Sequence, residues 1–398
     1  MEAGRTARGG TRPGIEVLLG ERAEDFRGAR LGLIAPPASV TRGLRSSVEA
    51  LIDHPGLELA ALFGPQHGIR GEKQDNMIES DSFRDPRTRL PVHSLYGDVR
   101  KPTPAMLDGI DVLLFDLQDV GVRVYTFVWT MTLAMEACRD AGVRFVVLDR
   151  PNPVGGEILE GAVLRPGYES FVGLHPVPLR HGLTAGELAR VANEAFGIGA
   201  DLDVVACEGW RRAHWFDDTG LPWVLPSPNL PTLDSAILYP GMVLLEGTNL
   251  SEGRGTTRPF EIVGAPYLRS RELAERLNDV GLPGVLFRPH GFEPTFNKHA
   301  GRLCGGVQIH VTDRLAFRPV DTAVHLLAAA RDLAPEHFHW SSPPYEYEAE
   351  KRPIDILWGN DRLRTRLNHG DPADAILGET RADLASFAEL AREHRIYD

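Results

Sequence analysis

The chain has 398 residues, of which 42% are hydrophobic and 25% charged, and its 55 Asp and Glu residues outnumber its 43 Lys and Arg residues, which gives a net charge of −12. This composition is typical of a globular protein with one large domain or two smaller ones. An acidic chain without a basic run is a poor match to nucleic acid, and no apolar stretch approaches the roughly 18 residues that span a bilayer. We therefore expect neither nucleic acid nor a membrane as a partner.

The first 13 residues are basic and glycine-rich and predict a flexible leader. Because no apolar segment follows them, they do not look like a secretory signal, and we expect a cytoplasmic protein. The three cysteines, Cys138, Cys207 and Cys304, are widely spaced. This spacing argues against a disulfide framework and a cysteine-rich zinc site, and it predicts buried thiols.

Apolar segments alternate with helical patterns through the first half of the chain. Strands are expected at residues 30–35, 57–63, 111–115, 144–148 and 202–206, and helices at 44–53, 127–141 and 184–196. Gly142 is placed to end the second helix, and Thr184 with Glu187 fits a capping box that starts the third. The alternation predicts an α/β fold in which residues 14–232 form a Rossmann-like domain with a parallel sheet.

Polar residues follow three of these strands at their carboxyl ends, where parallel sheets bind ligands. They are Gln66 and His67, then Asp116, Gln118 and Asp119, then Asp149, Arg150 and Asn152. One such group would be a surface loop, but three after successive strands predict a single crevice.

The proline-rich stretch at residues 226–231 indicates a domain junction, and residues 233–398 look like a smaller α+β domain. Residues 242–245 are expected to be a buried strand end. Asp371 is expected to cap a helix that has Pro372 at its first position. Further helices are expected at 270–278, 320–333, 372–377 and 380–395, and strands at 285–289 and 305–311.

The loop at residues 245–266 concentrates charge and glycine. It holds Glu246, Glu252, Glu261, Arg254, Arg258 and Asn249, among four glycines. Glycine lets the backbone approach a ligand closely, and loops on a rigid scaffold often carry sites. A solvated loop whose charges pair with one another explains the same residues.

The sequence lacks G-x-G-x-x-G, G-x-x-x-x-G-K-[ST], G-x-S-x-G and H-E-x-x-H. We expect no cofactor, and a metal site from His67, Asp116 and Asp149 is only weakly indicated. Carboxylates across a cleft suit glycoside hydrolysis, and arginines there suit a substrate carboxylate. The carboxylate candidates are Glu72, Glu79, Asp81, Asp116, Asp119, Asp149, Glu246, Glu252 and Glu261, and the arginines are Arg123, Arg150, Arg254 and Arg258. Tyr125, Phe260, Phe296 and the tryptophans are candidates to stack on a sugar ring, and core packing is the alternative expected for most of them.

Six motifs occur in an order that resembles the NamZ family of exo-β-N-acetylmuramidases. They are GPQHGIRG, DLQDVGVRVYTF, DRPNPVGG, RHGLTAGELA, PSPNLPT and EGTNLSEGRGTTRPFEIVGAP. The resemblance runs from about Leu31 to the C-terminus. It implies the removal of terminal β-linked N-acetylmuramic acid from peptidoglycan fragments during cell-wall turnover. It also implies a Rossmann-like domain, a smaller α/β domain and an active cleft between them.

The chain departs from the family pattern at Gln66, because the family's loop usually reads P-E-H-G and its glutamate is the favoured catalytic residue. Glutamine has no useful acid or base in the working pH range. Either another carboxylate such as Glu72, Glu79 or Glu252 has taken the role, or Gln66 orients an acetamido group or a water while His67 relays the proton, or the protein is inactive on the usual substrate.

The resulting hypothesis assigns Glu72, Glu252, His67 and Gln66 to catalysis, with a small sugar or muropeptide as substrate. Arg254 and Arg258 are the first choices for the lactyl carboxylate. The residues predicted to bind substrate are Asp116, Gln118, Arg123, Tyr125, Asp149, Asn152, Glu246, Asn249, Arg254 and Arg258. Two alternatives stay open, a non-catalytic muropeptide- or sugar-binding protein and a metal-dependent hydrolase.

Overall fold

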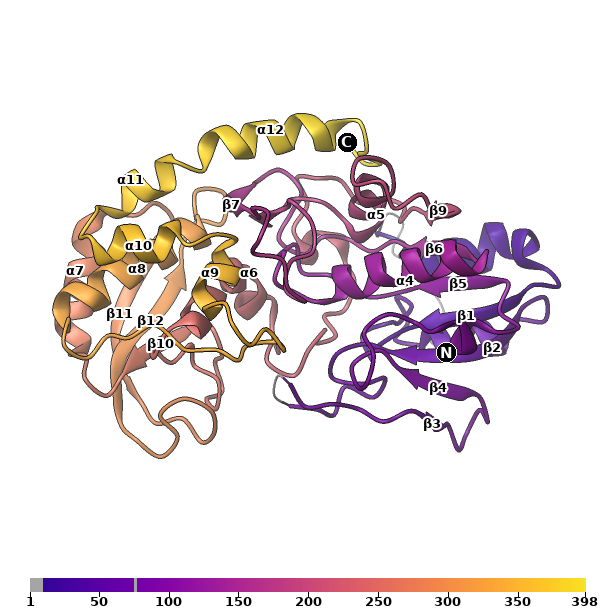
Figure 1. The fold of residues 1–398 in the computed structure, drawn as a ribbon, viewed down its shortest axis with the longest axis horizontal. Helices are drawn as coiled ribbons and strands as arrows, with labels where there is room; N and C mark the ends of the chain where they lie inside the picture. Colours follow the sequence, from indigo (N-terminus) through magenta and orange to yellow (C-terminus); the bar gives the residue numbers. More distant parts are fainter. Residues whose placement is uncertain (1–9, 75–76) are drawn as a thin grey trace, which may run out of the picture.

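The computed structural model describes residues 10–74 and 77–398. A seven-stranded sheet lies at one end of the molecule and a three-stranded sheet at the other, and the last helix runs across the top from one half to the other (Figure 1). The predicted α/β fold with two parts is confirmed. No helix within the described residues is long and apolar enough to cross a membrane.

The large sheet has the strand order β3-β4-β2-β1-β5-β6-β9 and is parallel except for the β3–β4 pair. Strand β2, which comes next along the chain, pairs with one side of β1. Strand β5 pairs with the other side of β1, so the direction in which strands are added to the sheet changes at β1. All four side chains of β5 are buried, as expected of a sheet covered on both faces. The strands are β1 (Arg30–Ile34), β2 (Glu58–Gly64), β3 (Phe83–Arg84), β4 (Pro91–Ser94), β5 (Val112–Phe115), β6 (Arg144–Leu148) and β9 (Leu202–Val205).

The helices of this half end and begin where their sequence signals predict. Gly142 takes a left-handed conformation, with φ 69°, at the end of α4, and Thr184 and Glu187 form the predicted capping box of α5. The helical elements are α1 (Gly14–Val17), η1 (Leu18–Arg22), η2 (Ala23–Phe26), α2 (Ser47–Ile52), α3 (Pro104–Leu107), α4 (Phe127–Ala141), α5 (Ala185–Glu194) and η3 (Phe216–Thr219), with a small hairpin of β7 (Glu160–Val163) and β8 (Pro178–Arg180).

The end of the predicted flexible leader is packed against the protein. Thr11 is buried and its N–H donates to the carbonyl of Thr219, and Arg12 pairs with Glu208 through backbone and side chain. The prediction of a free leader is therefore wrong for residues 10–13, because polar partners in a distant loop cannot be read from local composition. Residues 1–9 lie outside the described part.

The second half packs its helices on an antiparallel sheet of order β10-β12-β11. Its elements are α6 (Leu233–Met242), η4 (Val243–Gly247), β10 (Ile262–Ala265), α7 (Ser270–Val280), β11 (Val285–Phe292), β12 (Cys304–Val311), α8 (Pro319–Leu333), α9 (Pro353–Trp358), α10 (Arg362–Asn368), α11 (Ala373–Gly378) and α12 (Arg381–Arg392).

Two local predictions in this half are wrong. Residues 242–245 continue a buried helix instead of ending a strand, because a short apolar run that is buried on all sides has no period that separates the two. Pro372 is the N-cap of α11, one position earlier than predicted, so Asp371 does not cap this helix. The three cysteines are free and buried, as predicted.

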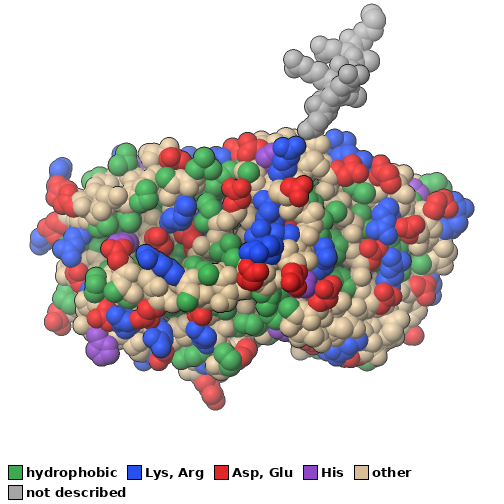
Figure 2. All heavy atoms as spheres, turned by 90° about the horizontal axis from the view of Figure 1, so that it is seen from above, with side chains coloured by type: hydrophobic (Ala, Val, Ile, Leu, Met, Phe, Trp, Pro, Cys, Tyr) green, Lys and Arg blue, Asp and Glu red, His purple; other side chains and the backbone are tan. Residues whose placement is uncertain are grey.

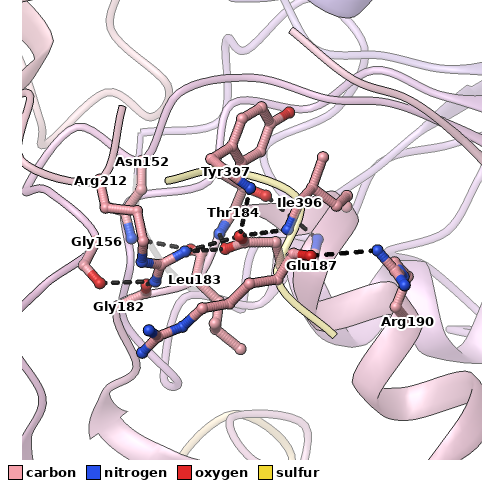
Figure 3. Close-up of polar contacts among 12 residues, drawn as sticks. Asn152, Gly156, Gly182, Leu183, Thr184, Glu187, Arg190, Arg212, Ile396 and Tyr397 are labelled. Carbon is pink, nitrogen blue, oxygen red and sulfur yellow. Dashed lines mark hydrogen bonds and ion pairs between the residues drawn. The ribbon is translucent and has the colours of Figure 1, made fainter. Parts of the chain in front are cut away.

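The surface seen from above mixes charges of both signs over the helices that join the two halves (Figure 2). Beneath this face, the C-terminal segment after α12 binds back to the first half. Glu187 accepts two hydrogen bonds from Nη1 of Arg212, at 2.7 and 2.8 Å, and one from the N–H of Ile396, at 3.0 Å (Figure 3). Because Glu187 is fully buried, this ion pair fastens the chain terminus to α5.

We expect Glu187→Gln to lower the free energy of unfolding by roughly 3–5 kcal/mol, because the shape is kept while Arg212 is left buried without its counter-charge. Urea unfolding followed by circular dichroism measures the change. Glu24→Gln breaks a surface pair with Arg27 and serves as the control that should leave the midpoint unchanged. Equal midpoints for the two variants would contradict this account of the terminus.

Candidate active site

Gln66 lies at the carboxyl end of β2, where the chain leaves the sheet toward the second half. Its Oε1 accepts a hydrogen bond from the Thr126 hydroxyl at 2.5 Å. Its Nε2 lies 3.2 Å from both the Tyr96 hydroxyl and Oε1 of Glu346, and donates to them. Three elements of the first half and one segment of the second therefore meet at this amide.

Glu346 belongs to the segment between α8 and α9, which reaches from the second half toward the first (Figure 1). The Tyr96 hydroxyl donates to its Oε2 at 2.6 Å, and the side chain is 3% exposed. Burial and the nearby charge of Glu246 raise the pKa of Glu346 above its ordinary value, although the hydrogen bonds of Tyr96 and Gln66 partly oppose this. Sequence reasoning missed this residue, because its only signal is the alternation of Tyr and Glu after a Pro-Pro pair.

The glycine-rich loop at residues 245–266 contributes a buried row of alternating charges. Arg254 lies between Glu246, at 2.7 Å, and Glu252, at 3.3 Å. Nζ of Lys298 contacts the other oxygen of Glu252 at 3.0 Å. The Tyr345 hydroxyl donates to Oε2 of Glu246 at 2.5 Å, which joins this row to the segment that carries Glu346.

The two best-defined carboxyl groups therefore have different protonation behaviour. Burial on its own would raise the pKa of Glu252, but Lys298 and Arg254 lower it below the ordinary value. The pKa of Glu346 is raised. A pair of carboxyls whose environments push their pKa values apart is the arrangement that acid–base catalysis uses.

Backbone strain gathers at the same place. His67, Phe260, Glu346 and Tyr347 all have positive φ, at 69°, 66°, 46° and 67°. Non-glycine residues rarely adopt this conformation, and such residues concentrate at functional sites. His67 follows Gln66, Phe260 belongs to the glycine-rich loop beside Arg254, and Glu346 and Tyr347 lie in the segment between α8 and α9.

Aromatic rings line the inner side of the site. The Tyr125 and Tyr239 rings meet edge to face with centroids 6.1 Å apart, and Tyr239 meets Phe260 in the same way at 4.9 Å. The guanidinium of Arg254 lies 5.3 Å from the Phe260 ring centroid. Tyr125 is buried in this wall, so ring packing rather than an open stacking platform describes it in this structure.

Most of the strand-end residues after β5 and β6 have partners within the protein, and the single crevice expected for the three groups stays a prediction. Asp116 receives two hydrogen bonds from Arg150, at 2.7 and 3.0 Å, and both side chains are buried. Gln118 donates to the carbonyls of Asp119 and Pro151. Asp116 and Gln118 are thus satisfied within the loops after β5 and β6. Oδ2 of Asp119 accepts from the N–H of Gly121, whereas its Oδ1 is buried without a hydrogen-bond partner among the described residues.

The side chains of Asp149 and Asn152 also form hydrogen bonds with other parts of the protein. Asp149 accepts hydrogen bonds from the Thr184 and Tyr397 hydroxyls, at 2.7 and 2.6 Å, and from the N–H of Gly186. Asn152 donates to the carbonyl of Leu183. Arg150 pairs with Asp116 and not with the adjacent Asp149, whereas Glu252 and Arg254 pair within the glycine-rich loop.

The arginines predicted to bind a substrate carboxylate already have partners. Arg123 is fully buried and donates to the carbonyls of Ala162, Val177 and Leu357. Arg254 is held by two glutamates, as described above. Arg258 is half exposed and pairs with Glu261 at 2.9 Å.

Three further residues of the predicted site are Glu72, His67 and Asn249. Glu72 is exposed, outside the cluster around Glu346. Nδ1 of His67 lies 2.7 Å from the carbonyl of Lys73. Asn249 is occupied within the second half, where its amide contacts His337 and Tyr267. Within residues 10–74 and 77–398, no three His, Cys, Asp or Glu side chains gather as metal ligands would, so His67, Asp116 and Asp149 do not meet.

Two family models match the chain in succession. The one described as Exo-beta-N-acetylmuramidase NamZ, N-terminal, matches residues 31–234, and the one described as Exo-beta-N-acetylmuramidase NamZ, C-terminal, matches residues 237–397. The chain is 49% identical over 384 residues to the peptidoglycan beta-N-acetylmuramidase NamZ of Bacillus subtilis strain 168. That alignment covers 96% of this chain and 91% of the relative.

Two solved structures of DUF1343 family proteins from Bacteroides fragilis share the fold. One has a TM-score of 0.89 at 35% identity and covers 98% of this chain and 100% of its own. The other has a TM-score of 0.74 at 26% identity and covers 98% and 99%. With both family models and a near full-length relative in agreement, the chain belongs to the NamZ family of exo-beta-N-acetylmuramidases.

Proposed function

We propose that the protein is a glycoside hydrolase that removes terminal β-linked N-acetylmuramic acid from peptidoglycan fragments. The observation that carries this is the 49% identity, over nearly the whole of both chains, to a peptidoglycan beta-N-acetylmuramidase. The buried cluster around Glu346 supports it, because a carboxyl group with a raised pKa suits the protonation of a glycosidic oxygen.

Glu346 acts as the general acid. It gives its proton to the glycosidic oxygen as the bond from that oxygen to C1 breaks, so the aglycone leaves as a neutral alcohol and Glu346 becomes a carboxylate. Each of its oxygens accepts one hydrogen bond, from Gln66 or from Tyr96, and keeps a second position for the substrate. This assignment replaces the glutamate that the family pattern places at position 66.

Gln66, Tyr96 and Thr126 are positioning residues for that acid. Thr126 fixes the Gln66 amide by donating to its oxygen, which leaves the NH2 group to face Glu346. An amide cannot take or give a proton in the working pH range, so Gln66 orients the carboxyl group instead of exchanging protons with it. His67 directly follows in the strained turn and holds the loop through Lys73.

Glu252 and Glu246 supply negative charge instead of protons. The lowered pKa of Glu252 keeps it ionised at neutral pH, which makes it a poor general acid. Glu246, held by Arg254 and Tyr345, lies on the side of the row nearer Glu346. A positively charged, oxocarbenium-like transition state gains from such fixed charge in a site with little water.

After the glycosidic bond breaks, C1 of the sugar gains a new bond to oxygen by one of two routes. If a water adds directly to C1 from the face opposite the leaving group, its proton passes to solvent, and the sugar inverts. If the oxygen of the 2-acetamido group first bonds to C1 and water then opens that ring, the proton of the water passes to the Glu346 carboxylate, and the β configuration is retained. Proton NMR of the first-formed anomer of the released sugar distinguishes the two routes, since mutarotation is slower than an early time point.

The same proposal includes three further points. The substrate is a peptidoglycan fragment, the protein is cytoplasmic, and the two domains divide between residues 232 and 233. The two family models meet between residues 234 and 237, which supports a division in this region. The cluster around Glu346 draws on both sides of it, so we place the active cleft there.

We expect Glu346→Gln to lower kcat on a disaccharide with a sugar leaving group by about 100- to 10,000-fold, the usual contribution of a general acid. On an aryl β-N-acetylmuramide, whose phenol leaves without protonation, the same variant should keep most of its activity. Steady-state kinetics on the two substrates measures the contrast. An equal loss of activity on both substrates would show that Glu346 does not donate this proton. If the unaltered protein binds the substrate without turning it over, the binding-protein alternative is favoured.

Tyr96→Phe should shift the basic limb of the kcat/KM profile to higher pH. The Tyr96 hydroxyl lowers the pKa of Glu346, so its loss raises that pKa further and keeps the acid protonated to a higher pH. A pH–rate profile of both proteins on the disaccharide measures the limb. A limb that stays in place or moves to lower pH would contradict the assignment.

Variants of Glu72 and Glu252 distinguish the sequence-based hypothesis, in which these two residues are catalytic, from the proposal that Glu346 is the general acid. Glu72→Gln is expected to keep kcat within about twofold, because the side chain is exposed and lies outside the cluster. Glu252→Gln is expected to lower stability, because Lys298 and Arg254 lose a buried partner. Kinetics and thermal unfolding of both variants test this, and a large loss of kcat in the Glu72 variant would restore it as a catalytic candidate.

A further inference from the structure

Arg100 lies in the loop after β4, on the outer side of the Tyr96 ring. Its guanidinium carbon is 4.5 Å from the Tyr96 ring centroid and 4.1 Å from that of Tyr347. The two rings meet edge to face at 5.8 Å, and Phe171 adds a third ring, 5.6 Å from the guanidinium. The arginine is thus held in an aromatic cage at the edge of the cluster around Glu346.

The same tyrosine connects this cage to the proposed acid. The Tyr96 hydroxyl donates to Glu346, while its ring face holds Arg100. Tyr347 directly follows Glu346 in the chain, and it is 44% exposed. The cage therefore lies between the buried acid and solvent.

Arg100 has unused hydrogen-bonding capacity. A guanidinium has five N–H donors, and the one polar contact of Arg100 among the described residues is from Nη1 to the carbonyl of Gly97. In the same part of the chain, no carboxylate lies within ion-pair distance of it. The exposed Glu79 at this edge interacts with the Tyr347 hydroxyl instead.

Stacking fixes the plane of a guanidinium but leaves its N–H edge open. That edge matches a carboxylate, with two parallel hydrogen bonds. The other arginines near the site, Arg123 and Arg254, are already occupied by carbonyls and glutamates. We propose that Arg100 is the residue that binds the carboxylate of the terminal sugar and so selects a lactyl-substituted sugar over one without that group.

This inference rests on the proposed function but concerns substrate choice, not the chemical step. Arg100 contacts the ring of Tyr96, whereas the Tyr96 hydroxyl is the group that donates to Glu346. We therefore expect the loss of Arg100 to raise KM for a charged substrate and to leave the hydrogen bond from Tyr96 to Glu346 in place.

The test compares an aryl β-N-acetylmuramide with its lactyl methyl ester, which has nearly the same shape without the charge. Unaltered protein should prefer the acid. Arg100→Gln should lower kcat/KM on the acid by about 10- to 100-fold, mainly through KM, and leave the ester rate unchanged. Arg100→Lys should recover part of the preference, because it restores the charge without the planar fork.

The matched control is Arg144→Gln, which removes an arginine at the start of β6 that lies over the ring of Phe26 and pairs with Asp203 at 2.6 Å. Its preference for the acid should equal that of the unaltered protein. Equal losses on acid and ester in Arg100→Gln, or no loss on either, would overturn the assignment to Arg100. If the unaltered protein cleaves neither substrate, the proposed function itself fails, which is a separate outcome.

Discussion

The contact between Glu346 and the pair Tyr96 and Gln66 is the interaction on which the active site depends. It joins the segment before α9 to the loops that follow β2 and β4, so the acid is assembled only when the two halves are in place. A carboxyl group taken out of water tends to keep its proton, and the two hydrogen bonds limit that tendency without removing it. The contact with Tyr96 and Gln66 thus sets the position of Glu346, buries its side chain and influences its pKa.

The charged loop at residues 245–266 has a second role in this arrangement. Its row of Glu246, Arg254 and Glu252 is buried and internally paired, with Lys298 at its end. Removing one partner from such a buried row would leave a charge uncompensated, so the row holds the loop in one arrangement. In the proposed function the loop provides fixed charge, and the proton transfer is assigned to Glu346, in the segment between α8 and α9.

Much of the fold follows from local pattern, and the site does not. Strands β5 and β6 and helix α4 lie where periodicity and end signals place them, because each is set by its own residues. Asp116, Arg150 and Asp149 were grouped correctly near strand ends, but which of them face a ligand depends on partners such as Tyr397, more than two hundred residues away. The only local signal of Glu346 is the alternation of Tyr and Glu after a Pro-Pro pair, and that alternation does not predict its burial against Tyr96 and Gln66. The family resemblance predicted the reaction, and the departure at Gln66 left three interpretations open, of which one is that another carboxylate takes the catalytic role.

The central claim, that Glu346 is the acid, is tested most directly by titrating its carboxyl group in the folded protein. Carbon NMR with carboxyl-labelled glutamate, assigned by the signal that is absent in Glu346→Gln, reports its pKa. The account predicts a pKa clearly above the ordinary value of about 4.3 for glutamate and equal to the pKa of the basic limb of kcat/KM. A Glu346 signal that titrates at or below the ordinary value would contradict it.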